Sequence, residues 1–279
     1  MHYEERAPHP RLRPFVEAYW ILTGSPESPA LDPILPDGRS EIIIHRAAPF
    51  LRVQAGSVPQ RQRSLLFGGQ LRTPTFLVAD GSADILGIRF RPCGASMFVR
   101  APQTEFVDEV IDAGDAVAPW LTETLQRAQE APTSDGAIAI LDGALLSRAT
   151  GPPRGFAAAS AAVDRLLASR GQATIEQVAA DTGLSRRHIE RVFLRHVGVS
   201  PKFFARIQRF QSAVDAIARD PWIEVALAHG YADQPHLIRD FRALGGASPQ
   251  RLMANLGELT RVFTDAYRRK ISVNSKLET

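Results

Sequence analysis

Three arginines spaced four residues apart, Arg187, Arg191 and Arg195, have the most informative side-chain chemistry in this sequence. Residues at positions i, i+4 and i+8 of a helix lie on one face. Each guanidinium presents a rigid fork of N–H donors that can form paired hydrogen bonds with phosphate oxygens or with the edge of guanine. A helix beginning after Ser185 would therefore offer a row of such donors to a polyanion.

The segment that holds these arginines occurs twice. Residues 178–201 and 225–249 come into register at a spacing of 48 after one extra residue in the second copy. A period of this size indicates one supersecondary unit used twice. The matched positions are Ile189 with Leu237, Arg191 with Arg239, Phe193 with Phe241, and Gly198-x-Ser200-Pro201 with Gly246-x-Ser248-Pro249.

Each copy carries the capping and turn residues expected of two helices joined by a tight turn. Thr174 and Gln177 form a capping-box pattern at the start of the first helix. Gly183 favours the left-handed turn that ends this helix, and Ser185 caps the next one. The equivalent second-copy positions are Asp220 as cap, Pro221 at the first helical position, Gly230 at the turn and Asp233 as cap.

Residues 200–219 lie between the copies and are predicted to form a connecting helix. About 19 residues at about 1.5 Å each give a rod of about 28 Å. Two recognition helices held by it could enter successive major grooves, which recur about every 34 Å. An arginine face on one helix could simply be solvated, but the matched repeat favours double-stranded DNA as partner. The candidate DNA-binding residues are Arg186, Arg187, Glu190, Arg191, Arg195, Gln234, His236, Arg239 and Arg242.

Residues 156–255 resemble the DNA-binding region of AraC/XylS-type bacterial transcription regulators. The motifs are Ile175-x-x-Val178-Ala179, Ser185-x-x-x-Ile189-x-Arg191-x-Phe193, Gly198-x-Ser200-Pro201, Gly230-Tyr231-x-Asp233-Gln234-x-His236-x-x-Arg239-x-Phe241 and Gly246-x-Ser248-Pro249. The resemblance implies that Arg187, Glu190 and Arg191 read bases in one groove. It implies that Gln234, His236 and Arg239 read bases in the next.

Chain length and charge distribution indicate two domains. The chain has 279 residues and a net charge of +3, divided into −4 for residues 1–150 and +7 for residues 151–279. A basic half joined to an acidic half is expected of a DNA-binding domain attached to another module. We assign residues 1–150 to an effector-sensing or dimerisation domain, 156–255 to the double helix-turn-helix domain and 256–279 to a C-terminal tail.

The cysteine and histidine content argues against several classes of site. The single Cys93 excludes an intramolecular disulfide, and the histidines of the N-terminal half are too scattered for a metal triad. We predict no metal, no cofactor and no catalytic residue. The sequence has no apolar run long enough to span a bilayer and no secretory signal, so a cytoplasmic location is expected.

The N-terminal half alternates short apolar segments with Gly- and Pro-containing breaks, which predicts an antiparallel sheet or barrel. Expected strands cover residues 15–22, 42–45, 51–53, 65–67, 75–78 and 85–90, and residues 25–36 are expected to be a loop. Helices are expected at 94–100, 106–111, 115–129, 134–148 and 157–169. The predicted class is α+β, with a mixed N-terminal domain and an all-α C-terminal domain.

This half also resembles the uncharacterised input domain of some of these regulators. The similar motifs are Leu35-Pro36-Asp37-Gly38, Phe67-Gly68-Gly69-Gln70 and Gly87-Ile88-Arg89-Phe90-Arg91-Pro92. Ligand pockets are mostly apolar with few polar groups, and a charge near a core needs a partner. We therefore select Arg89, Arg91, Trp20 and Phe90 as candidate residues for binding an unknown small-molecule effector.

Two alternatives remain open for the N-terminal half. Arg91-Pro92-Cys93-Gly94 faintly resembles the Pro-Cys motif of DNA-repair alkyl acceptors, which would make Cys93 a nucleophile, although the following His-Arg is absent. The half could instead be a protein-interaction module without a ligand. A second copy of the chain, as a homodimer, and RNA polymerase are further partners that the regulator class allows.

Overall fold

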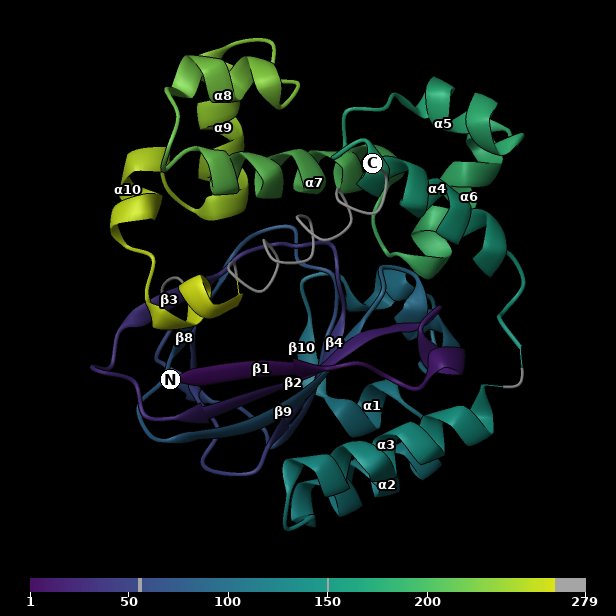
Figure 1. Ribbon diagram of the computed structural model, residues 1–279, viewed down its shortest axis with the longest axis vertical. Helices are drawn as coiled ribbons and strands as arrows, with labels where there is room; N and C mark the ends of the chain where they lie inside the picture. Colours follow the sequence, from purple (N-terminus) through teal and green to yellow (C-terminus); the bar gives the residue numbers. More distant parts are fainter. Residues whose placement is uncertain (55–56, 150, 264–279) are drawn as a thin grey trace.

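The computed structural model describes residues 1–54, 57–149 and 151–263. Its N-terminal half contains two antiparallel sheets with a small group of helices, and its C-terminal half consists of helices and connecting loops (Figure 1). The fold is α+β, as the sequence predicts.

The larger sheet has six antiparallel strands in the order β1-β2-β9-β4-β7-β10. Its register places Ile42 beside both Ile88 and Phe67, so these side chains share one face. That apolar face packs against the helices that follow the sheet in sequence. The strands are β1 (His2–Arg6), β2 (Val16–Gly24), β4 (Glu41–His45), β7 (Leu65–Gly68), β9 (Ala83–Phe90) and β10 (Val110–Asp112), and the helices are α1 (Ala113–Ala116), α2 (Pro119–Glu130) and α3 (Ser134–Arg148).

The smaller sheet covers the opposite face of the larger one. Buried Trp20 and Leu22 from β2 pack there with Ile85 from β9, and Ile34 and Leu77 from the smaller sheet join the same cluster. The four strands lie in the order β3-β8-β5-β6. They are β3 (Leu31–Ile34), β8 (Thr75–Val78), β5 (Leu51–Val53) and β6 (Gln60–Arg61).

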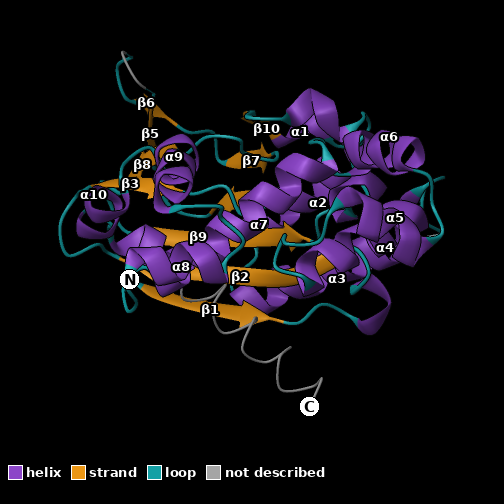
Figure 2. Ribbon diagram, turned by 90° about the horizontal axis from the view of Figure 1, so that it is seen from above, coloured by secondary structure: helices purple, strands orange, loops and turns teal. Residues whose placement is uncertain are grey.

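The C-terminal half contains the two predicted helix-turn-helix units, α5–α6 and α8–α9. They lie at opposite ends of α7, which crosses above the sheets (Figures 1 and 2). The helices are α4 (Phe156–Ala168), α5 (Ile175–Thr182), α6 (Arg186–His196), α7 (Pro201–Ala216), α8 (Trp222–Ala228), α9 (Gln234–Gly245) and α10 (Pro249–Ala254).

The two units belong to different hydrophobic cores. Ile189 and Phe193 of the first unit belong to a cluster that continues into the larger sheet through Phe15 and Phe90. The second unit packs instead around α7, where the ring centroids of Phe210 and Phe241 are 5.1 Å apart. The first unit is thus continuous with the core of the N-terminal half.

Several elements differ from the sequence prediction. Residues 25–36 are not all loop, because Leu31–Ile34 forms β3, an edge strand where Pro33 is tolerated. The expected helix at 106–111 ends in strand β10, which pairs with β7. The expected helix at 94–100 is a short 3-10 turn at Gly94–Met97, η2. The other 3-10 turns are η1 (Pro10–Leu12) and η3 (Gln103–Phe106).

The start of the second unit is shifted by one residue. Pro221, predicted at the first helical position, is itself the N-cap of α8, and Asp220 precedes it. Strand β1 was not predicted, because its residues HYEER are mostly polar and it is stabilised by pairing along β2. These elements depend on tertiary contacts more than on local signals.

The chain after α10 returns to the N-terminal half. Residues 258–263 are helical and lie near β3 and β8 (Figure 1). Their first turn is capped by the carboxylate of Asp32 from β3. Asp32 is 3 % exposed and accepts hydrogen bonds from the amide nitrogens of Leu259 at 2.8 Å and Thr260 at 3.2 Å, and from the Thr260 hydroxyl at 2.6 Å. The predicted tail thus begins as part of the N-terminal fold, while its Tyr267 and the basic residues 268–270 lie outside the described residues.

The Asp32 cap gives a stability prediction. We expect Asp32→Ala to lower the free energy of unfolding by about 1–3 kcal/mol, because two buried amides lose their acceptor and the Thr260 hydroxyl keeps only the Pro33 carbonyl, 2.6 Å away. Urea denaturation of the full chain, followed by circular dichroism, measures this loss. Asp135→Ala is the control, since that carboxylate is 79 % exposed and its 3.5 Å pair with Arg6 should contribute little. Equal losses in the two variants would contradict the capping role.

Candidate nucleic-acid interface and interdomain cavity

The first helix-turn-helix unit is held by the caps that the sequence predicts. The Thr174 hydroxyl accepts from the Gln177 amide at 3.2 Å, and the Gln177 side chain accepts from the Thr174 amide at 2.8 Å. Gly183 has a φ of 65°, the left-handed conformation that ends α5. The Ser185 hydroxyl then accepts from the His188 amide at 3.2 Å and starts α6. These bonds fix where the arginine-bearing helix begins.

Helix α6 divides into an inner and an outer face. Ile189, Val192 and Phe193 are buried, whereas all five candidate residues of this helix are exposed. Arg186 pairs with Glu176 of α5 at 2.9 Å, so this arginine also links the two helices of the unit. The exposed candidates are Arg186, Arg187, Glu190, Arg191 and Arg195.

The second unit presents a smaller polar face. Asp233 caps α9 by accepting from the His236 amide at 2.6 Å. Arg239 and Arg242 are exposed, but Gln234 and His236 are only half-exposed. The His236 ring lies edge-on to Tyr231, with centroids 5.2 Å apart. The structure therefore orients His236 by local contacts and leaves the two arginines projecting into solvent.

Helix α7 joins the second unit through an ion pair as well as through its apolar side. The Arg206 guanidinium lies 2.8 Å from the carboxylate of Asp240 on α9. Asp240 is only 3 % exposed, and a buried charge is costly unless it is paired. This pair helps to fix the position of α9 relative to α7.

The same helix is bonded to the loop after β3. Gln211 donates to the Pro36 carbonyl at 2.6 Å, and Gln208 donates to the Asp37 carbonyl at 3.2 Å. Gly38, with a φ of 84°, lies so close to Gln208 that a side chain at this position would collide with it. The loop at residues 36–38 is therefore the surface on which α7 docks.

The first unit contacts the N-terminal half through a buried histidine. The His196 Nδ1 lies 2.9 Å from the Ser96 hydroxyl, and its Nε2 lies 3.1 Å from the Arg154 carbonyl. Burial lowers the pKa of His196, and the neighbouring Arg195 acts in the same direction. Arg91, at the same boundary, pairs with Asp164 of α4 at 2.9 Å.

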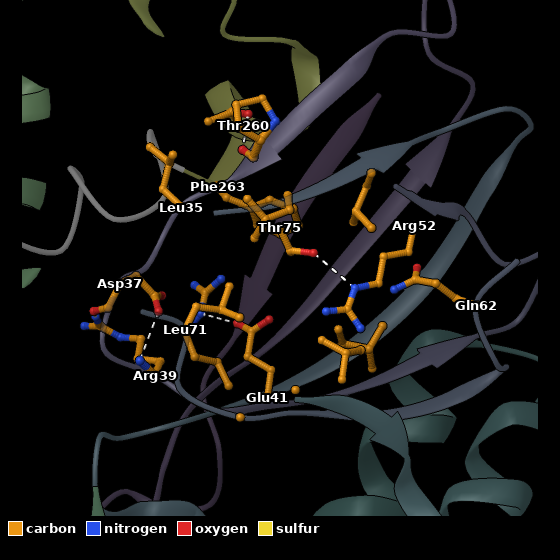
Figure 3. A pocket seen from close by; sticks show the side chains of 18 of the residues that line it. Leu35, Asp37, Arg39, Glu41, Arg52, Gln62, Leu71, Thr75, Thr260 and Phe263 are labelled. Atoms are coloured by element: carbon orange, nitrogen blue, oxygen red, sulfur yellow. Dashed lines mark hydrogen bonds and ion pairs between the residues drawn. The ribbon is translucent and has the colours of Figure 1, made fainter. Parts of the chain in front are cut away.

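A cavity of about 130 Å³ lies between the two sheets of the N-terminal half (Figure 3). The larger sheet contributes Glu41 and Arg89, and the smaller sheet contributes Arg52 and Thr75. Gln211 of α7 lines the same cavity, as do Thr260 and Phe263 from the helical segment 258–263. Side chains of the N-terminal sheets, of α7 and of the returning segment thus meet at one hollow.

The four candidate effector residues are not brought together. Arg89 lines the cavity, but it is 6 % exposed and bonded to Glu41 and Glu5. Trp20 packs beside it against Tyr3 and Phe263 without lining the cavity. Phe90 faces the opposite side of the larger sheet, and Arg91 lies at the contact with α4.

Three residues that line the cavity are not among the candidates predicted from the sequence: Arg52, Asp37 and Gln211. Arg52 stands between two apolar residues of a short strand, Leu51 and Val53, and this alternation could have identified an inward-facing charge. Asp37 belongs to the motif Leu35-Pro36-Asp37-Gly38, but the motif does not indicate where its side chain lies. Gln211 carries no sequence signal, because its importance comes from docking against the Pro36 carbonyl.

Three further features bear on the class of protein: the Cys93 thiol, clusters of metal-ligating side chains and long apolar helices. Cys93 is 3 % exposed, and burial raises the pKa of its thiol, so the thiolate required by an alkyl acceptor is disfavoured. Among residues 1–54, 57–149 and 151–263, no cluster of three or more His, Cys, Asp or Glu side chains is arranged to hold a metal ion. In the same described part of the chain, no helix combines the length and apolar character that crossing a bilayer requires.

Comparison with known families divides the chain into two matched segments. Residues 178–255 match a helix-turn-helix domain, and residues 4–112 match a domain of unknown function, DUF6597. No curated protein matches the chain. The helix-turn-helix match contains every candidate DNA-binding residue.

Solved structures give distant similarities. An AraC-type DNA-binding regulator from Chromobacterium violaceum is 22 % identical over 36 % of this chain and 92 % of its own, with a TM-score of 0.34. ToxT from Vibrio cholerae is 9 % identical over 86 % of this chain and 99 % of its own, with a TM-score of 0.46. ToxT with a bound unsaturated fatty acid is 9 % identical over 90 % and 98 %, with a TM-score of 0.44.

The environment of His196 gives a pH prediction. Because its pKa is lowered in the folded chain, the neutral ring stabilises the native state above about pH 6.5, and this contribution is lost as pH falls through the folded pKa. We expect the difference in unfolding free energy between the wild-type chain and His196→Gln to shrink as pH falls from 7 to 5. Its slope should be at most about 1.4 kcal/mol per pH unit. Urea titrations at each pH measure this difference.

His2→Gln serves as the matched control, because His2 is exposed on the edge strand. The same urea titrations are made on this variant. A difference for His196→Gln that does not change with pH would show that the His196 ring does not titrate differently in the folded and unfolded chains.

Proposed function

We propose that this chain, whose residues 178–255 form an AraC-type helix-turn-helix DNA-binding domain, is a transcription regulator that contacts duplex DNA through both units and is controlled by a small-molecule effector. The observation that carries the proposal is the pair of capped helices, α6 and α9, which expose arginines at matched places of the repeat.

The length of α7 supports contact of both units with one duplex. Helix α7 has 16 residues, which corresponds to about 24 Å at about 1.5 Å per residue. The units are attached at its two ends (Figure 1). Because the units lie at opposite ends of this helix, we place α6 and α9 in successive major grooves, which recur about every 34 Å.

We assign the contacts by exposure and chemistry. Arg187, Glu190 and Arg191 would read base edges in one groove, with Arg able to pair with guanine and Glu able to accept from cytosine. In the second groove, Gln234, His236 and Arg239 take the equivalent role. The remaining arginines, Arg186, Arg195 and Arg242, would contact phosphates, which positions the protein without reading sequence.

The cavity is the proposed effector site. A ligand there would contact Gln211, and Gln211 belongs to the helix that joins the two DNA-binding units. A ligand that binds better to one arrangement of α7 would shift the population towards it and so change DNA affinity. In this scheme residues 1–150 sense the effector and 156–255 bind DNA, while 256–263, the described part of the predicted tail, complete the sensing domain.

Arg239 provides a test of base reading. We expect Arg239→Ala to weaken binding to duplexes selected in vitro by the wild-type chain by about 1–3 kcal/mol, and to relax selection at one base pair. Fluorescence anisotropy with selected and random duplexes measures both effects. Arg63→Ala is the matched control, because Arg63 is exposed in the N-terminal half. An equal loss on selected and random DNA would assign Arg239 to a phosphate.

Salt dependence tests the electrostatic part of the same interface. Neutralised phosphates release counterions, so log Kobs should fall linearly with log salt concentration by about 0.9 for each phosphate contacted. Arg195→Ala should reduce this slope by about 0.9 and weaken binding to all sequences alike. Titrations of the full chain at salt concentrations from about 50 to about 200 mM measure the slope. A slope unchanged by the substitution would remove Arg195 from the interface.

A further inference from the structure

The charged side chains around the cavity fall into two sets. Most are already paired within the protein. The Arg39 guanidinium lies 2.6 Å from the carboxylate of Glu17, and Arg89 lies 2.6 Å from Glu41 and 2.9 Å from Glu5. These pairs compensate charges that are largely removed from water, and they leave little capacity for an incoming ionic group.

Arg52 differs from the other two arginines. Its Nε donates to the Thr75 hydroxyl at 3.2 Å, and no carboxylate among the described residues lies within ion-pair distance of it. Its two terminal nitrogens also have no hydrogen-bond partner in that part of the chain. Figure 3 shows the side chain entering the cavity beside Thr75 and Gln62. A half-buried guanidinium is thus held in one orientation with its outer donors available.

The surroundings of Arg52 are chiefly apolar. Leu77 and Ile34 come from the smaller sheet, Ile43 from the larger one, Leu71 from the loop between β7 and β8, and Phe263 from the returning helical segment. The carboxylates of Asp37 and Glu41 line another part of the cavity (Figure 3). The arginines on that side, Arg39 and Arg89, are already paired, so a second carboxylate placed there would be removed from water without a cation of its own.

We propose that the cavity binds a small organic monocarboxylate, with its carboxylate against Arg52 and its apolar body between the two sheets. An arginine fork matches the two oxygens of a carboxylate, and the charge-assisted bonds that result are stronger than neutral ones. The other side of the cavity, where Arg39 and Arg89 are already paired, selects against dicarboxylates. The ligand's role as an effector rests on the proposed function. Its binding to the cavity does not, because that binding can be measured without DNA.

The experiment uses the full-length chain and a defined set of probes. Benzoate, phenylacetate and hexanoate are the acids, the corresponding primary amides are their neutral counterparts, and adipate is the dicarboxylate. Calorimetric titration gives each dissociation constant. At least one acid should bind saturably to the wild-type chain, at least tenfold more tightly than its amide and than adipate.

Two substitutions locate the carboxylate. Arg52→Gln should weaken the bound acid at least tenfold and leave the weak binding of the amide unchanged, while Arg52→Lys should retain part of the preference for the acid. Arg63→Gln is the matched control, since it removes one exposed arginine outside the cavity lining. Thermal unfolding of each variant without ligand shows whether the chain is folded. If Arg52→Gln is unfolded, the partial preference of Arg52→Lys for the acid still tests the proposal.

Three outcomes would overturn the assignment. They are an absence of binding by all three acids, equal affinities for acid and amide, and undiminished acid binding by folded Arg52→Gln. DNA affinity measured with and without the bound acid separates this inference from the proposed function. An acid that binds through Arg52 without changing DNA affinity supports the ligand class and contradicts the regulatory role, whereas a chain that fails to bind DNA contradicts the proposed function alone.

Discussion

The docking of α7 on the loop at residues 36–38 is the interaction on which the rest of the structure depends. Its apolar side chains, including Phe204 and Phe210, supply buried area. The side-chain amides of Gln208 and Gln211 orient α7, because their hydrogen bonds to the Asp37 and Pro36 carbonyls require the helix to lie in this position. A buried amide without its partner is costly, so these contacts specify where the DNA-binding helices stand relative to the sheets.

The two DNA-binding units are held in different ways. The first shares its core with the larger sheet and is bonded to it through His196. The second is reached through α7 and packs mainly around that helix. A change at the cavity, where Gln211 lies, therefore acts on the element that carries the second unit, while the first unit is anchored by a separate set of contacts. Any regulation through this cavity would alter the relation between the units more readily than the shape of either one.

Local signals explain what could be predicted from the sequence. The capping box of Thr174, the turn at Gly183 and the cap at Asp233 act over three or four residues, so the helix-turn-helix units could be located in advance. Strands β3 and β10 escaped prediction because they are stabilised by partners distant in the chain. Residue type alone also could not assign a face of a strand: Phe90 and Arg89 are neighbours in β9, yet only Arg89 faces the cavity. Arg52 lay in a strand that was predicted, but only the three-dimensional arrangement shows that it lacks a carboxylate partner.

The cap formed by Asp32 joins residues that are synthesised at an early and a late stage of translation. When β3 emerges from the ribosome, Leu259 and Thr260 have not been synthesised, and both helix-turn-helix units must be translated before the carboxylate finds its donors. The N-terminal fold is thus completed after the helix-turn-helix units, although it comes first in the chain. Cutting the chain after residue 150 would yield an N-terminal piece in which Asp32 has lost these three hydrogen bonds, and a nascent chain would pass through the same unfinished state during translation.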